Sequence, residues 1–307
     1  MSFERAPLRY SILMPCVVVA LCSGFAFTSS SRAQEPKKAE QAKPADQTKP
    51  AEQPKRADLP KRGDQPKEVT AEQVAESVII IAGNGAGRAM LTQIRKNGLE
   101  RGRETHTSAD GRAEEIRYEL RFVHGEKPDK DKVRLDSKTP QAEYSLVYGE
   151  GRLFGIINGA TFTPRADTAA DFIAQQAHSI DALLRYKEYE SKVTSAGKDK
   201  QQGIDLYVID LVDKAGRKTR YFVSARSFRV LSLEYEETRP GSATPVKYTK
   251  RFYDYRFAQG TWVPYRTVLL EDGKLTVETH ILTVQYGVKM EDSLFQNPEA
   301  AASSGNP

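Results

Sequence analysis

Apolar and charged residues alternate most regularly over residues 114–124, in the segment EEIRYELRFVH. A period of two indicates an antiparallel strand with one face buried and the other in water. Asp110 and Gly111, just before it, are typical of a hairpin turn, which predicts a partner strand over residues 99–107. The buried face is predicted to carry Ile116, Tyr118, Leu120 and Phe122, and the opposite face Glu115, Arg117, Glu119 and Arg121.

The same alternation returns later in the chain, where short turns separate successive strands. The segment AEYSLVYGEGRLFGIING predicts a hairpin that turns at residues 149–151. From residue 203 to about residue 287 the pattern is that of a meander, because short connections favour antiparallel pairing between neighbouring strands. Its turns are expected at residues 214–216, 225–228, 259–260 and 272–273.

Helical spacing of apolar residues appears before and between these strand regions. Thr70 and Gln73 offer a capping box for a helix over residues 71–82, and a second helical stretch ends near Gly98. Residues 168–189, TAADFIAQQAHSIDALLRYKEY, form a third helical segment, in which His178 is expected to face water.

Gly83, Gly85 and Gly87 separate the first two helical stretches, in the segment SVIIIAGNGAGRAML. Three glycines before a helix also occur in nucleotide-binding folds, where backbone amides hold phosphates. Such a fold needs strands that alternate with crossover helices, whereas hairpins follow Gly87 here. We therefore predict a joint between two helices.

The first 68 residues differ in composition from the rest of the 307-residue chain. Residues 1–33 carry two arginines, Arg5 and Arg9, before an apolar run and a small-residue cleavage site, and predict a signal peptide; a membrane anchor over residues 11–27 is the alternative. Residues 34–68 contain five proline-rich hexapeptides with almost no apolar residues, and predict a disordered spacer. One folded domain is expected over residues 69–298, followed by a disordered tail at 299–307.

Charge and cysteine content exclude several classes of function. The net charge is +5, of which residues 1–33 and 34–68 carry +2 each, so residues 69–307 carry only +1. A nearly neutral domain is not typical of a nucleic-acid-binding protein. The basic segments RYKEYESK and KYTKRFYDYR are therefore expected to be solvated. Both cysteines, Cys16 and Cys22, lie in the predicted signal, which leaves no disulfide or thiolate site in the domain.

No pattern of catalytic or metal-binding residues stands out. The four histidines, His106, His124, His178 and His280, have no second ligand at the spacing of a metal site, and no serine lies in a nucleophile motif. We predict a protein that is not an enzyme and has no catalytic residue, cofactor or metal.

The predicted architecture is an α+β fold, in which a strongly curved antiparallel sheet forms a half-barrel and helices cover its concave face. Such a sheet can enclose an apolar cavity. Eight residues are candidates to line it, although the same pattern would arise if they filled an ordinary core. They are Ile116, Tyr118, Leu120, Phe122, Leu231, Leu233, Tyr235 and Trp262.

The C-terminal region resembles the end of outer-membrane lipoprotein-sorting proteins, the LolA-like group. The similar features are an aromatic DYR at residues 254–256, a strand with Val263 and Pro264, and a final D-x-x-F-x-x-P formed by Asp292, Phe295 and Pro298. The resemblance extends in the same order over about residues 70–298.

The resemblance implies a periplasmic binder or carrier of lipoprotein acyl chains or other lipids, which works near a membrane and has an envelope protein as a further partner. Relatives that sense envelope stress provide the alternative, a tethered protein-interaction module with no small ligand.

Overall fold

The computed structural model describes residues 68–298. The predicted signal or anchor, the predicted C-terminal tail and all but the last residue of the predicted spacer lie outside this range. Within residues 68–298, no helix combines the length and the apolar composition needed to cross a membrane.

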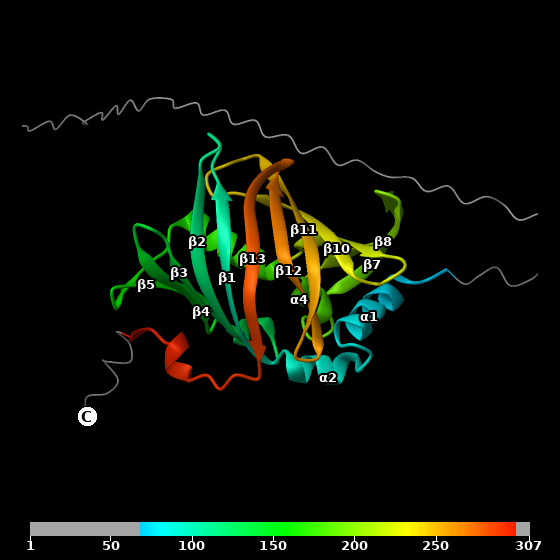
Figure 1. The fold of residues 1–307 in the computed structure, drawn as a ribbon, viewed down its shortest axis with the longest axis horizontal. Coiled ribbons are helices and arrows are strands. Elements are labelled where there is room, and N and C mark those ends of the chain that lie inside the picture. Colours follow the sequence, from blue (N-terminus) through cyan, green and yellow to red (C-terminus); the bar gives the residue numbers. More distant parts are fainter. Residues whose placement is uncertain (1–67, 299–307) are drawn as a thin grey trace, which may run out of the picture. The chain divides into compact units, whose positions relative to one another are not determined.

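One antiparallel sheet of 13 strands dominates the structure (Figure 1). It is open and curled, as the predicted half-barrel requires. Its spatial order is β6-β5-β4-β3-β2-β1-β13-β12-β11-β10-β9-β8-β7. The first and last strands of the chain, β1 and β13, therefore pair with each other at the centre, and a meander extends from each of them to an edge. The strands are β1 (Asn97–Thr107), β2 (Ala113–Val123), β3 (Lys132–Lys138), β4 (Glu143–Gly149), β5 (Arg152–Ile157), β6 (Ala160–Phe162), β7 (Lys192–Gln201), β8 (Ile204–Val212), β9 (Lys218–Ser224), β10 (Val230–Thr238), β11 (Pro245–Ala258), β12 (Thr261–Glu271) and β13 (Lys274–Tyr286).

Within residues 68–298, four α-helices and two short 3-10 helices accompany the sheet, and Figure 1 shows β11 to β13 in front of α4. The predicted capping box begins α1, because Gln73 N donates to Thr70 Oγ1 and Thr70 N donates to Gln73 Oε1. The helices are α1 (Ala71–Ala82), α2 (Gly87–Ile94), α3 (Ala166–Ala177), α4 (Ile180–Leu184), η1 (Pro128–Lys130) and η2 (Asp292–Phe295).

The glycine segment is the joint that was predicted. Gly83 ends α1, and its backbone N–H donates to the carbonyl of Ile79. Gly85 and Gly87 have φ values of 87° and 75°, in the left-handed region that favours glycine. The joint turns the chain from α1 into α2, after which β1 begins.

Helices and strands pack in two apolar clusters on the inner face of the sheet. The larger one joins α1 and α4 to β7–β11, with Ile79, Leu183 and Leu233 at its centre. The smaller one places Phe172 of α3 against Val133 and other residues of β2–β6. The predicted alternation in β2 holds, because residues 116, 118, 120 and 122 share this inner face in register with β1 and β3.

The opposite face of β2 is less exposed than the alternation suggests. Glu115 and Arg117 are exposed, but Glu119 and Arg121 are half-buried. Arg121 pairs with both Glu119 and Asp136, and Arg101 also pairs with Glu119. These charges are partly withdrawn from water because they pair across strands β1, β2 and β3.

The third helical segment is not continuous. It breaks at His178 and Ser179, between α3 and α4, where Ser179 Oγ accepts from Ala182 N and caps α4. The expectation that His178 faces water is wrong, since its side chain is only 1% exposed.

Candidate functional site

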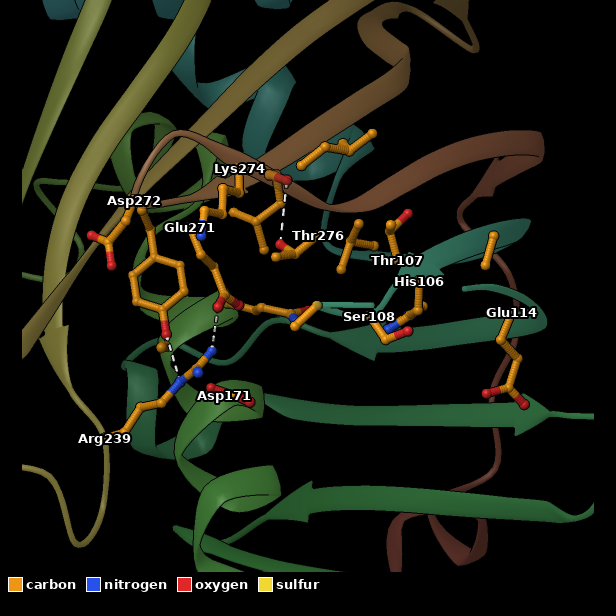
Figure 2. Close-up of a pocket in the computed structure, with 18 of the residues that line it drawn as sticks. His106, Thr107, Ser108, Glu114, Asp171, Arg239, Glu271, Asp272, Lys274 and Thr276 are labelled. Carbon is orange, nitrogen blue, oxygen red and sulfur yellow. Dashed lines mark hydrogen bonds and ion pairs between the residues drawn. The ribbon is translucent and has the colours of Figure 1, made fainter. Parts of the chain in front are cut away.

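A cavity of about 1370 Å³ lies on the inner side of the sheet (Figure 2). It is bounded by α3, by the turn between β1 and β2, and by the ends of β10 to β13 that lie near this turn. Ala170 and Ala174 contribute the helix side of its wall. Because both are small, α3 leaves room between itself and the strands.

The floor of the cavity is aromatic and aliphatic. Tyr235 and Tyr248 stand side by side on β10 and β11 with stacked rings, whose centroids are 4.9 Å apart. Leu269 and Val277, which are opposite each other on β12 and β13, continue the apolar surface. The rings and aliphatic side chains of this floor can contact an apolar ligand, and the hydroxyl of Tyr248 keeps its hydrogen bond from Arg239.

Charged side chains surround the floor. Arg239 Nη2 lies 2.6 Å from Glu271 Oε2, and Arg239 Nε donates to the hydroxyl of Tyr248 at 3.1 Å. Burial alone would lower the pKa of Arg239, but Glu271 raises it above its usual value. For Asp171, which projects from α3, burial has the opposite effect and raises the pKa. Six carboxylates and three cationic side chains line the cavity in all, so its polar wall is unfavourable for a strongly anionic group.

His178 links α3 to the strands beside this cavity. Its Nδ1 lies 2.6 Å from Thr219 Oγ1 and its Nε2 lies 3.0 Å from Glu237 Oε1, and Glu237 is part of the cavity wall. The imidazole stacks on Tyr235 at 3.9 Å between centroids. The sequence did not reveal this role, because a histidine inside a helical pattern carries no signal of its strand partners.

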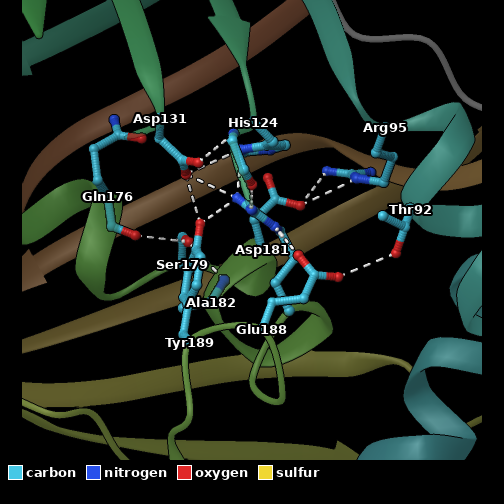
Figure 3. Close-up of polar contacts among 12 residues, drawn as sticks. Thr92, Arg95, His124, Asp131, Gln176, Ser179, Asp181, Ala182, Glu188 and Tyr189 are labelled. Carbon is cyan, nitrogen blue, oxygen red and sulfur yellow. Dashed lines mark hydrogen bonds and ion pairs between the residues drawn. The ribbon is translucent and has the colours of Figure 1, made fainter. Parts of the chain in front are cut away.

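A second polar cluster joins α4 to the loop after β2 (Figure 3). Arg185 Nη1 donates to Asp131 Oδ2 at 2.8 Å, Nε donates to Glu188 Oε2 at 2.7 Å, and Nη2 donates to the carbonyl of Gly125 at 2.7 Å. Arg185 and Tyr186 are buried. The prediction that RYKEYESK is solvated is therefore wrong at these two residues, because α4 brings them against the β2–β3 connection and α1.

The eight predicted cavity residues all lie within the described part of the chain, but the structure does not bring them together. Only Tyr235 lines the cavity. Leu233 is fully buried in the larger cluster, and Leu120 and Phe122 pack in the smaller one. The remaining four lie elsewhere. Tyr118 donates to Glu100 Oε1 at 2.7 Å, and Ile116 is half-buried near the beginning of β2. Leu231 packs with Phe222 in a third cluster, and Trp262 lies against Phe257 and Arg229.

Leu231 illustrates why the alternation was misleading. An irregularity in the pairing of β9 with β10 falls between Val230 and Ser232. Val230 and Leu233 both join the larger cluster, whereas Leu231 joins Leu206, Val208 and Phe222 on the other side of the strands. A bulge changes which positions share a face, and this one could not be predicted from the local sequence.

Leu120 provides a test of core against cavity. Because Leu120 packs in the cluster under Phe172 rather than on the cavity wall, Leu120→Ala should lower the melting temperature without changing the amount of bound lipid. We expect a loss of about 1–2 kcal/mol, below the usual range for a fully buried leucine. Thermal unfolding and native mass spectrometry of the same preparation measure the two effects. A loss of lipid at unchanged stability would place Leu120 in the binding site.

The described residues 68–298 contain no group of three or more His, Cys, Asp or Glu side chains arranged to hold a metal ion. The absence of an enzyme activity and of a cofactor remains a prediction.

Comparison with known proteins identifies the fold. No protein-family model matches the sequence, and no curated protein matches it closely enough to count as a relative. Solved structures do match. A domain assigned to outer membrane lipoprotein sorting from Vibrio parahaemolyticus is 13% identical, with a TM-score of 0.50, over 72% of this chain and 97% of that one.

Two further structures are similar to the same extent. A DUF1329 family protein from Desulfovibrio piger and a LolA superfamily protein from Nitrosomonas europaea are each 11% identical, with a TM-score of 0.52, over 75% of this chain and 98% of theirs. The chain therefore has a LolA-like fold, as the resemblance in its C-terminal region predicted. Identities this low establish the fold alone.

Proposed function

We propose that the protein is an exported, non-enzymatic binder or carrier of lipids or lipoprotein acyl chains in the periplasm. The observation that carries this proposal is the cavity of about 1370 Å³ between α3 and the curved sheet. Sites for small molecules are usually about 300–1,000 Å³, so this one is large enough for a long-chain ligand. Its floor of Tyr235, Tyr248, Leu269 and Val277 supplies the apolar contact that such a chain needs.

The polar wall narrows the class of ligand. Asp171, Glu237 and Glu271 stand beside the floor, and Arg239 is already paired with Glu271. A lipid with a neutral or zwitterionic head should therefore bind better than one whose head carries only negative charge, because carboxylates around the cavity outnumber cationic side chains by six to three.

Native mass spectrometry of the protein purified from a bacterial envelope tests the function. We expect adducts with the masses of lipids, and, after delipidation, reloading from vesicles of zwitterionic phospholipid in preference to anionic vesicles. A protein that is bare after purification and takes up no lipid from either kind of vesicle would contradict the proposal and support the protein-interaction alternative.

A cavity-filling variant tests the location. Ala174 is half-buried and lines the cavity from α3, so Ala174→Trp places an indole where the ligand would lie. We expect lipid retention to fall roughly tenfold, since about 1.4 kcal/mol of lost contact is enough for that change. Ala166→Trp is the matched control, because Ala166 is exposed at the start of the same helix and does not line the cavity. If both variants retain equal amounts of lipid, the ligand does not bind in this cavity.

A further inference from the structure

Helix α3 is held by few contacts for an element that forms a cavity wall. Among its 12 residues, only Phe172 is buried. Arg165, the residue before the helix, makes no side-chain cap, and the C-terminal end of the helix is followed directly by His178. Segments with few buried contacts open at low free-energy cost, so the attachment at His178 has a large share in keeping α3 in place.

The contacts of His178 define its protonation state. An ionised Glu237 can only accept, so His178 Nε2–H donates to Glu237 Oε1 at 3.0 Å. In the neutral ring Nδ1 then accepts from the hydroxyl of Thr219 at 2.6 Å. Both ring nitrogens are satisfied when the imidazole is neutral. Tyr221 adds a second link at the same junction, because its hydroxyl donates to the carbonyl of Ser179 at 2.8 Å.

Protonation of His178 works against this arrangement. The added proton on Nδ1 would point at Thr219, so the Thr219 hydroxyl would have to turn from donor to acceptor. The new charge would also lie on a ring that is only 1% exposed, beside a threonine that is only 2% exposed. The charged groups around the ring are Glu237 on β10 and Asp213 and Arg217 at the turn between β8 and β9, with Tyr235 stacked on its face. Burial lowers the pKa of His178 below its usual value, and Arg217 acts in the same direction, while Glu237 and Asp213 oppose them.

The stability that His178 contributes falls as the pH is lowered. A histidine with a lowered pKa contributes stability that is fully present above the ordinary value of about 6.5 and is lost as the pH falls toward the folded-state pKa. The loss is concentrated where the histidine is attached, at the junction of α3 with the sheet.

We propose that His178 is a proton-sensitive latch, which fixes α3 over the cavity when neutral and releases it when protonated. The part of this inference that concerns ligand release rests on the proposed function, whereas the motion of α3 does not. Neutral conditions would keep the cavity closed around a ligand, and a local drop in pH would open it. The position of α3, which forms one wall of the cavity, would thus depend on the protonation of His178.

A distance measurement tests the motion directly. Gln175 on α3 and Lys274 on β13 are both exposed and both line the cavity, so spin labels can be attached through Gln175→Cys and Lys274→Cys in a full chain with Cys16 and Cys22 replaced by serine. Double electron–electron resonance at about pH 7.5 and about pH 5 brackets the histidine range. We expect one narrow distance distribution at the higher pH and a longer, broader one at the lower pH.

Three variants distinguish a latch at His178 from a nonspecific loosening of the structure at low pH. His178→Gln cannot titrate, and its distribution should be the same at both pH values. Glu237→Gln keeps an acceptor for Nε2–H but removes the charge that favours protonation, so the opening should shift to lower pH. His280→Gln is the control, because His280 is partly exposed and its side chain bonds to Glu278 of the same strand. Two results would overturn the latch. One is the same distance distribution at both pH values in the labelled protein that keeps His178, and the other is an equal opening at low pH in His178→Gln.

Lipid adducts measured at the same two pH values keep the two proposals distinct. Opening together with loss of lipid at low pH supports both. Opening in a protein that holds no lipid at either pH supports the latch and contradicts the lipid-binding function. Lipid bound at both pH values with no opening contradicts the latch alone.

Discussion

Replacing Arg185 by alanine is expected to destabilise the folded protein by about 3–5 kcal/mol, the range seen when one partner of a buried ion pair is removed. The Arg185 side chain is 7% exposed and that of Asp131 is 13% exposed, with 2.8 Å between Nη1 and Oδ2. The alanine variant leaves the Asp131 carboxylate without its cation and also removes the donor to the carbonyl of Gly125. Chemical denaturation at pH 7 measures the loss.

Two comparisons show whether burial is the cause. Lys138→Ala breaks a pair with Glu143 in which both side chains are about two-thirds exposed, and should cost less than about 1 kcal/mol. The deficit of Arg185→Ala should also shrink as the pH falls toward about 4, because protonation of Asp131 removes the unpaired charge. In the intact protein, protonation of Asp131 on acidification lowers the stability instead of relieving an unpaired charge. Burial alone would raise its pKa, but contacts with His124, Tyr189 and Arg185 lower it, so its stabilising contribution is lost on acidification. A deficit below 1 kcal/mol at pH 7 would show that the Arg185 pair is as weak as a surface pair.

Leu183→Ala is expected to cost about 2–5 kcal/mol, as for other large-to-small changes in a well-packed core. Leu183 is fully buried and lies on α4 in the larger cluster, with Ile79 of α1 and Tyr221 of β9 as fellow members. The five-residue helix α4 has little stability of its own, so this packing holds it in place.

Leu282→Ala is the matched control for Leu183→Ala. Leu282 is 62% exposed on β13, and the same deletion of side-chain atoms there should change the free energy of unfolding by less than about 0.5 kcal/mol. Equal losses for the two leucines in thermal or chemical unfolding would contradict the assignment of Leu183 to the core.

Much of the fold could be predicted because strong local patterns agree with it. The hairpin between β1 and β2 follows from strict alternation and from Asp110 and Gly111, and the turns after β8, β11 and β12 follow from Gly216, Gly260 and Gly273. Strands β3 and β7 could not be predicted in the same way. Their sequences, KVRLDSK and KVTSAGKDKQ, are mostly polar, and β7 is an edge strand with only Val193 buried. Pairing with β8, rather than burial, makes β7 a strand, whereas β3 is paired on both sides and buries Val133 in the smaller cluster.

The cavity was harder to predict than the sheet. Alternation shows which residues share the inner face, but it does not distinguish positions that a helix covers from positions that it leaves open. Leu233 and Tyr235 share the inner face of one strand, yet only Tyr235 reaches the cavity. The answer depends on where α3 crosses the sheet, and therefore on the small side chains of Ala170 and Ala174 and on the break at His178.

The pairing of β1 with β13 also determines when the molecule can fold. Residues such as Gly98 and Tyr286 become neighbours only after almost the whole chain has been made, and contacts so distant in sequence form slowly. Until β13 arrives, β1 and β12 would both be open edges, and a ribosome-bound or truncated chain would present them to other molecules. A nascent chain of this design cannot complete its sheet until most of its synthesis is over, so the arrival of β13 is the step that closes the sheet.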